Sequence, residues 1–94
     1  MRESQIENYL KREVEKLGGL CLKFVSPGNK GVPDRIIILP NGQVIFAELK
    51  NETGRLSPLQ VKMQETLNKF NCRSFVLTSK PSVDKLMSEM RDEL

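Results

Sequence analysis

The chain has 94 residues, of which 38% are hydrophobic and 29% charged, and its net charge is +3. This length suits one domain spanning residues 1–94, and the composition is that of a globular protein rather than a disordered or membrane protein. The absence of His and the wide separation of the only two cysteines exclude imidazole catalysis and Cys- or His-rich zinc sites, so catalysis would need carboxylates, lysine and a hard metal ion.

The first predicted helix spans residues 4–17, where apolar side chains recur at helical spacing: Ile6, Leu10, Val14 and Leu17. Ser4 and Glu7 match the S-x-x-E capping box, and Gly18-Gly19 would end the helix. A strand is predicted over residues 20–25, where leucines and a phenylalanine alternate on one face. The following segment, SPGNKGVP, reads as a loop because it holds two glycines and two prolines.

Two apolar runs, residues 34–39 and 44–50, predict paired central strands, because both of their faces are apolar. Pro40-Asn41-Gly42 lies between them. Proline favours the first central position of a type I turn, which predicts a three-residue loop with Gly42 in the left-handed conformation. In that register Leu39 pairs with Gln43, Ile36 with Phe46, and Asp34 with Glu48.

The second predicted helix begins with Ser57 as the N-cap and Pro58 in its first turn, and Asn71 ends it. Its expected buried stripe consists of Leu59, Met63, Leu67 and Phe70. A strand over residues 73–78 follows, and then a helix from about Ser82 with one apolar face: Val83, Leu86, Met87, Met90 and Leu94. The predicted order is therefore α-β-β-β-α-β-α. The four phenylalanines stand at core spacings, and Tyr9 is the aromatic expected to be exposed.

The predicted hairpin brings chemistry-bearing side chains together at one end. With Asp34 opposite Glu48, the two carboxylates lie on one face, and Lys50, two residues further on, faces the same way. Such a pair of carboxylates can bind Mg²⁺ or Mn²⁺, with the Leu49 carbonyl as a further ligand. The alternative is a cross-strand ion pair without catalysis, although the apolar neighbours of Glu48 make an unligated charge there costly.

The motifs G-V-P-D (31–34), E-L-K (48–50) and G-R-L-S-P-L-Q (54–60) resemble the virus-type replication-repair nuclease (VRR-NUC) domain of the PD-(D/E)XK nuclease superfamily. The resemblance implies an α/β fold with a mixed central sheet flanked by helices. It implies that Asp34 and Glu48 bind the metal and that Lys50 is the catalytic lysine. It also places Glu7 at the metal or its water and Gln60 near the active site. Both of these residues have a second explanation, because each is the third residue of a capping box.

The excess positive charge lies in residues 21–62, which contain six basic and three acidic residues. Lys23, Lys30 and Arg55 border the inferred site and are candidate phosphate contacts, or ordinary solvated charges. The N-terminus lacks the apolar run that is typical of a signal peptide, and this predicts a cytoplasmic protein.

The resemblance implies a metal-dependent endonuclease, encoded by a bacterium or a phage, that acts as a homodimer on branched DNA such as four-way junctions. The alternatives are a flap or weakly selective nicking nuclease and a catalytically silent DNA-binding module.

Overall fold

The computed structural model describes all 94 residues and contains three helices and four strands. Their bounds are α1 (Glu3–Lys16), β1 (Leu20–Lys23), β2 (Arg35–Ile38), β3 (Val44–Leu49), α2 (Pro58–Lys69), β4 (Arg73–Leu77) and α3 (Lys80–Glu93). The predicted element order is confirmed. None of the helices has the length and apolarity that crossing a bilayer requires, and both cysteines are free thiols.

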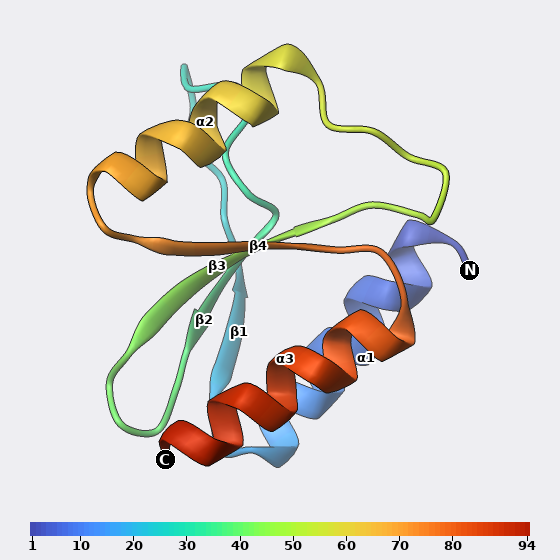
Figure 1. The fold of residues 1–94 in the computed structure, drawn as a ribbon, viewed down its shortest axis with the longest axis vertical. Helices are drawn as coiled ribbons and strands as arrows, with labels where there is room; N and C mark the ends of the chain where they lie inside the picture. The colour runs from blue at the N-terminus through green and yellow to red at the C-terminus, as the bar shows by residue number, and fades with distance from the viewer.

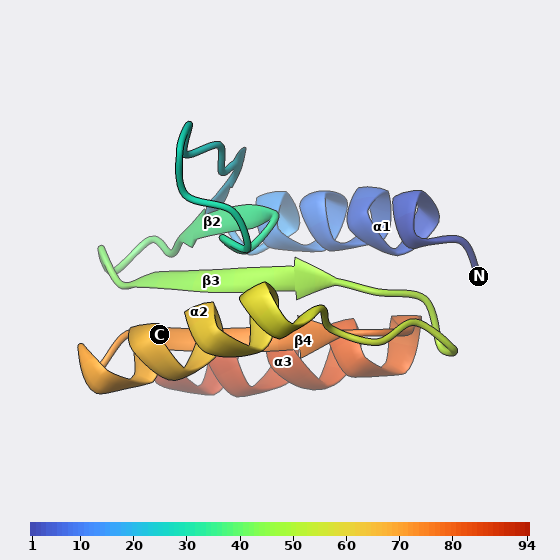
Figure 2. The same cartoon turned by 90° about the horizontal axis from the view of Figure 1, so that it is seen from above.

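The four strands form one mixed sheet in the order β1-β2-β3-β4. The first three strands are antiparallel, whereas β4 runs parallel to β3. Helices α1 and α3 lie side by side on one face of the sheet, and α2 lies on the other (Figures 1 and 2). The predicted α/β architecture, a mixed sheet flanked by helices, is therefore confirmed.

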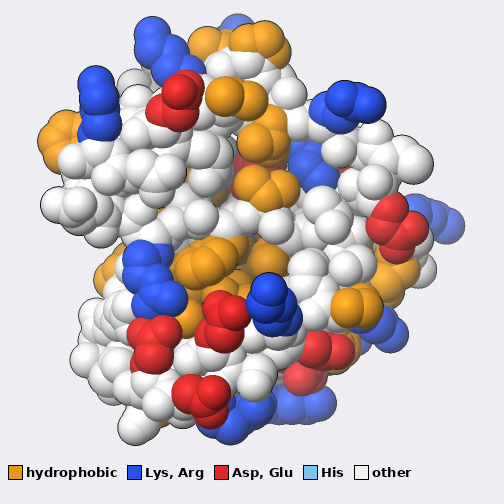
Figure 3. Space-filling model, in the orientation of Figure 1, with side chains coloured by type: hydrophobic (Ala, Val, Ile, Leu, Met, Phe, Trp, Pro, Cys, Tyr) orange, Lys and Arg blue, Asp and Glu red, His pale blue; other side chains and the backbone are white.

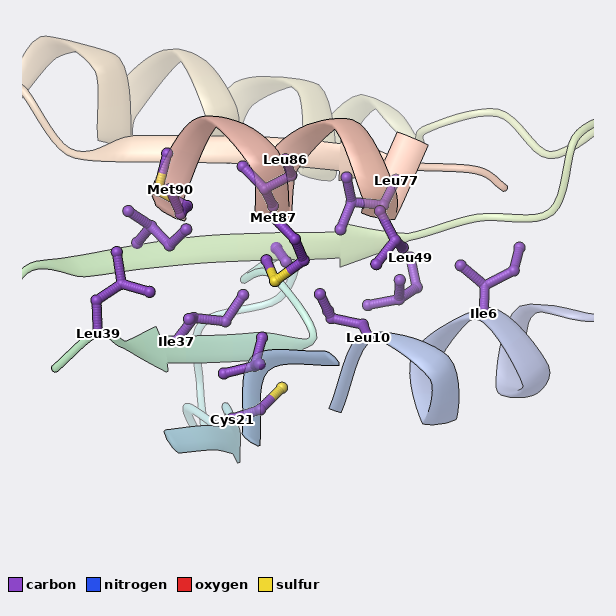
Figure 4. Close-up of a cluster of buried hydrophobic side chains, with 14 residues drawn as sticks. Ile6, Leu10, Cys21, Ile37, Leu39, Leu49, Leu77, Leu86, Met87 and Met90 are labelled. Atoms are coloured by element: carbon purple, nitrogen blue, oxygen red, sulfur yellow. The ribbon is translucent and has the colours of Figure 1, made fainter. Parts of the chain in front are cut away.

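The hydrophobic core lies between the sheet and the α1–α3 layer (Figure 4). Apolar residues at helical spacing on α1 and α3 face every second residue of β2 and β3, as the periodicities of the two element types require. The sheet contributes Ile37, Ile45, Ala47 and Leu49, and the helices contribute Ile6, Leu10, Val14, Val83, Leu86, Met87 and Met90. Each of these side chains is at most 3% exposed, so this face forms a dry core.

The β2–β3 hairpin has the predicted register, with Ile36 opposite Phe46. The Leu39 amide donates a hydrogen bond to the Gln43 carbonyl at 2.9 Å, which closes the three-residue loop. Gly42 has a φ of 87°, in the left-handed region that glycine adopts without strain. Local turn chemistry therefore sets the alignment on which the candidate site depends.

The predicted buried stripe of α2 is wrong at both of its ends. Leu59 is 51% exposed and Phe70 is 75% exposed, and no residue of this helix is fully buried. The helix packs mainly against β4, an edge strand, so only the middle of its apolar stripe meets the sheet. None of the four phenylalanines belongs to the buried core: Phe70 is exposed, Phe24 and Phe46 are half-buried, and Phe75 is half-buried and packs against the core. Tyr9, expected to be exposed, is half-buried and also packs against the core.

Three smaller predictions also need correction. Helix α1 begins at Glu3, so its N-cap is Arg2 and not Ser4. The Arg2 amide donates a hydrogen bond to the Gln5 side-chain oxygen at 2.8 Å. Helix α3 begins at Lys80, two residues before the predicted start, because Ser79 is its N-cap. Leu94 lies beyond the end of α3 and is half exposed.

The face of the sheet beside α2 is only partly covered. Leu20, Leu22 and Val44 are 45–55% exposed there, whereas Cys21, between the two leucines, points into the core. A groove of about 310 Å³ between β4 and α3 is also lined mainly by apolar side chains. Figure 3 shows apolar side chains open to solvent along the middle of this view. Apolar surface thus remains open on both faces of the sheet.

Candidate active site

Asp34 and Glu48 meet at the end of the β2–β3 hairpin. Asp34 immediately precedes β2, and Glu48 is the penultimate residue of β3. Extending the register by two residues from the pair Ile36–Phe46 sets the two acids opposite each other on the α2 face. One oxygen of Asp34, Oδ2, accepts a hydrogen bond from the Leu49 amide at 2.8 Å. That bond fixes the Asp34 side chain against β3.

The Glu48 carboxylate is almost completely buried, with 2% of the residue exposed. Its Oε2 atom accepts a hydrogen bond from Gln60 at 3.0 Å and lies 4.0 Å from the Lys50 Nζ atom. Its Oε1 atom is buried and has no hydrogen-bond partner. Burial and the neighbouring charge of Asp34 raise the pKa of Glu48 to about 8, which Lys50 only partly offsets. A buried carboxylate with one unpartnered oxygen is unfavourable unless it binds something.

Gln60 caps α2 and also contacts Glu48. Its backbone amide and side-chain Oε1 form a reciprocal capping box with Ser57, at 3.2 and 2.9 Å. The same side chain donates from Nε2 to Glu48. The cap therefore fixes the amide in the orientation that satisfies one oxygen of Glu48 and leaves the other free.

Gly31 holds the loop before β2 against the start of α2. Its φ of 91° lies in the left-handed region. A Cβ atom at this position would stand 2.6 Å from the Leu59 carbonyl oxygen and 3.1 Å from the Gln60 amide nitrogen. The two backbones therefore approach as closely as only glycine permits. This contact fixes the distance between the segment that carries Asp34 and the helix that carries Gln60.

Glu7 pairs with two basic residues. Because α1 begins one residue earlier than predicted, Glu7 has no part in a capping box. Its Oε2 atom is 2.6 Å from Arg35 Nε and 3.1 Å from Lys23 Nζ. Burial alone would raise the pKa of Glu7, but hydrogen bonds from Lys23 and Arg35 bring it below its usual value. No group of three acidic side chains is arranged to hold a metal ion.

Arg35 is the residue of this region that the motifs did not single out. It is 7% exposed, and besides Glu7 it contacts the Cys21 carbonyl oxygen through Nη1 at 3.1 Å. Its signal in the sequence is an arginine at the head of an otherwise apolar strand, R-I-I-I. A second acid on α1 also acts on the site, because the charge of Glu3 contributes to the raised pKa of Glu48.

The three candidate phosphate contacts are all exposed residues. Lys30 belongs to the loop before β2 and Arg55 to the loop before α2, and both are exposed. The Lys23 side chain is 68% exposed while its Nζ atom contacts Glu7. A hollow of about 420 Å³ opens between the start of α1 and the loop after β3, lined by Met1, Arg2, Gln5, Asn51, Glu52 and Thr53. All three cations are thus accessible to solvent, whereas Glu48 is buried and Asp34 is half-buried.

This arrangement combines two acceptor groups with one amine. Asp34 and Glu48 supply the hard oxygen ligands that Mg²⁺ and Mn²⁺ prefer. The unpartnered Glu48 oxygen is available for such an ion, and the Lys50 side chain, 18% exposed, reaches the same carboxylate. The donor set therefore fits a divalent cation, with a cationic group beside it.

Known proteins are similar to this chain in sequence and in fold. Residues 1–81 match the family model of the VRR-NUC domain. The "Putative nuclease p44" of Acyrthosiphon pisum secondary endosymbiont phage 1 is 44% identical over 79 residues, which cover 84% of this chain and 85% of that protein. A solved structure described as a "VRR_NUC domain" superposes with a TM-score of 0.86 at 37% identity, covering 92% of this chain and 94% of its own.

Proposed function

The chain belongs to the VRR-NUC domain family, and on this premise we propose that it is a metal-dependent DNA endonuclease that hydrolyses phosphodiester bonds. The observation that carries the proposal is the buried Glu48 carboxylate, with one unpartnered oxygen, opposite Asp34. Nothing in the packing of the sheet requires an acid at that position. A metal-dependent nuclease needs one there, because the carboxylate would hold the cation that stabilises the negative charge developing on the phosphate.

Asp34 and Glu48 would hold Mg²⁺ or Mn²⁺, with the Leu49 backbone carbonyl as a third protein ligand. Such an ion, when bound, activates water and offsets the charge of the phosphate. Gln60 orients Glu48 by holding its Oε2 atom, so that the free Oε1 atom keeps a fixed direction. Asp34 is held in the same way by the Leu49 amide. The chain therefore preorganises both carboxylates before any ligand binds.

We assign to Lys50 the stabilisation of the negative charge that develops on the phosphate. Its Nζ atom lies 4.0 Å from Glu48 Oε2, too far for a strong hydrogen bond but within reach of a group bound beside the carboxylates. In this role it orients the attacking water or stabilises the transition state. Lys23, Lys30 and Arg55 are proposed as contacts to neighbouring phosphates, which position the DNA without reading its sequence.

We further propose that the enzyme is a homodimer acting on branched DNA such as four-way junctions. One chain contains one site, so cutting two strands symmetrically needs two sites in fixed geometry, which a two-fold dimer supplies. Leu20, Leu22 and Val44 leave apolar surface open beside α2 that a second copy would cover.

Plasmid nicking tests the reaction. We expect supercoiled DNA to be nicked with Mg²⁺ or Mn²⁺ and to stay intact with EDTA. Asp34→Ala or Glu48→Ala should lower the rate by more than about 10³-fold, because each removes an essential part of one catalytic unit. DNA affinity in a gel shift should change little. Asp92→Ala, which removes an exposed acid of α3, is the matched control and should cut normally. Full activity of highly purified Glu48→Ala protein would contradict the site.

Substrate preference and assembly need separate experiments. A panel of labelled hairpins, flaps, three-way and four-way junctions ranks the substrates, and a cruciform plasmid should be linearised in one encounter by a dimer. Product that stays nicked indicates a single-site flap or nicking enzyme. DNA binding without any cleavage indicates a silent binding module. A sedimentation mass of 10.7 kDa, that of one chain, with and without junction DNA would rule out the dimer.

A further inference from the structure

Arg35 is an unusual residue for the place it occupies. It and Glu48 are the only charged residues that are buried, and it directly follows Asp34. Successive residues of a strand point to opposite faces, so the Arg35 side chain lies on the α1 face while Asp34 lies on the α2 face. The proposed function uses Asp34 and leaves Arg35 without a role.

The Arg35 guanidinium joins three elements. Its Nε atom is 2.6 Å from Glu7 Oε2 on α1, and its Nη1 atom donates to the Cys21 carbonyl of β1 at 3.1 Å. Lys23 stands opposite Arg35 in the register of β1 and β2, and it contacts the same Glu7 oxygen at 3.1 Å. A buried guanidinium is strongly unfavourable without a counter-charge. Glu7 therefore neutralises two adjacent cations, and its carboxylate is committed to them.

These contacts fix the segment that carries Asp34. The Phe24 amide donates to the Asp34 carbonyl at 2.9 Å, and the next residue, Arg35, is anchored to α1 and β1 by its side chain. On the other side, the Asp34 carboxylate accepts from the Leu49 amide at 2.8 Å. Loosening the Arg35 anchor would let the start of β2 shift and would lengthen that last bond.

We propose that Arg35 is a positioning residue of the nuclease site and that Glu7 acts through it, by holding the start of β2 in place, rather than by binding the metal. The inference rests on the proposed function for its purpose. The positioning contacts of Arg35 are tested without metal or DNA, so the inference and the proposed function can fail separately.

Amide hydrogen exchange of the metal-free protein tests the anchor. The Leu49 amide reports its bond to Asp34, and the Leu39 amide, which donates to Gln43 at the far end of the same hairpin, is the internal reference. We expect Arg35→Met to speed exchange at Leu49 about tenfold or more relative to Leu39. Arg35→Lys, which keeps the charge, should fall between Arg35→Met and the unaltered protein. The matched control is Arg73→Met, because Arg73 pairs with Glu93 between β4 and α3, and it should leave the ratio unchanged.

Mn²⁺ binding measured by calorimetry then separates the two roles of Glu7. Residues that orient a metal ligand typically change metal affinity by about 10–100-fold. We expect such a loss in Glu7→Gln and in Arg35→Met. The double variant should lose no more than the worse single variant, because both changes remove the same interaction.

Two outcomes would overturn the inference. The first is equal acceleration of exchange at Leu49 and Leu39, which shows that Arg35 serves only general stability. The second is a double variant whose loss of Mn²⁺ affinity is the product of the two single losses, which shows that Glu7 binds the metal directly. If Glu7→Gln and Arg35→Met bind Mn²⁺ like the unaltered protein, Arg35 has no positioning role, whether or not the protein cuts DNA.

Discussion

On one face of the sheet Ile37, Ile45 and Leu49 are fully buried against α1 and α3, whereas on the opposite face Leu20, Leu22 and Val44 remain about half exposed beside α2. The second face nevertheless contains Glu48, one of the most deeply buried side chains of the chain. Helix α2 buries none of its own residues there, but its capped first turn delivers Gln60 to that carboxylate. The comparison shows that stability and chemistry are divided between the two faces.

The division has a physical basis. A dry apolar core gains free energy in proportion to the area it buries, and this gain is largest where every position is apolar. A carboxylate raised in pKa by burial reduces that gain, so it is tolerated on the face that contributes less. The Gly31 contact and the Gln60 hydrogen bond then add to the packing of α2 against β4 in fixing this helix.

The largest difference in stability between the two faces should appear when neighbouring side chains of β2 are truncated. Ile37→Ala should lower the free energy of unfolding by about 2–5 kcal/mol, because it opens a cavity in the dry core. Ile36→Ala, on the half-covered face, should cost less than half as much. Urea unfolding followed by circular dichroism measures both. Equal losses would show that the two faces contribute equally.

Substitutions on the face beside α2 should change the cleavage rate rather than the stability. Lys50→Met should lower the cleavage rate by ~10²–10³-fold, the usual effect of removing one group that stabilises transition-state charge. The Mn²⁺ affinity should change little, since Lys50 is assigned no role as a ligand. Single-turnover rates and calorimetry make the two measurements, with Lys85→Met on α3 as the control. Loss of metal binding in Lys50→Met would mean that the roles are divided wrongly.

Two glycines of the loop before β2 distinguish the effect of backbone strain from the effect of a close approach to the α2 backbone. Gly28 and Gly31 both have a positive φ, but a Cβ atom meets nothing within 4 Å at Gly28 and the α2 backbone at Gly31. Gly28→Ala should cost about 1–2 kcal/mol of stability from backbone strain alone. Gly31→Ala should cost more and should also slow cleavage, because it displaces Gln60. Thermal unfolding and plasmid nicking test this, and identical behaviour of the two variants would contradict it.

The pH dependence of metal binding should be about tenfold in affinity per pH unit, or about 1.4 kcal/mol. The pKa of Glu48 is about 8 in the metal-free protein, so below that pH the ion must displace a proton. Mn²⁺ affinity should therefore rise between pH 6 and pH 8 and level off above. Calorimetry in buffers of different ionisation enthalpy counts the released proton. A flat profile would show that Glu48 is already ionised.

The same group sets the sign of the pH effect on stability. The folded-state pKa of Glu48 lies above its ordinary value of 4.5, so the folded protein binds more protons than the unfolded chain between those values. Stability of the metal-free protein should thus fall as the pH rises from about 4.5 to about 8. Glu48→Gln should abolish this decline, which urea midpoints at pH 5 and pH 8 would show.

The sequence alone determined the elements and the hairpin. Apolar periodicity placed α1, α3 and the strands within one or two residues of their bounds, and Pro40-Asn41-Gly42 gave the register that sets Asp34 opposite Glu48. These features follow from local rules of spacing and turn conformation, which act over a few residues and are therefore readable from the chain.

Tertiary structure alone decided which residues the two helices deliver to the sheet. The α2 stripe looked like a core face, yet Leu59 and Phe70 are exposed because the helix lies over an edge strand. Glu7 matched a capping box, yet it has no part in the cap and pairs with Arg35, 28 residues away. Burial and ion pairing depend on how separate elements pack together, and periodicity within one element carries no record of that packing.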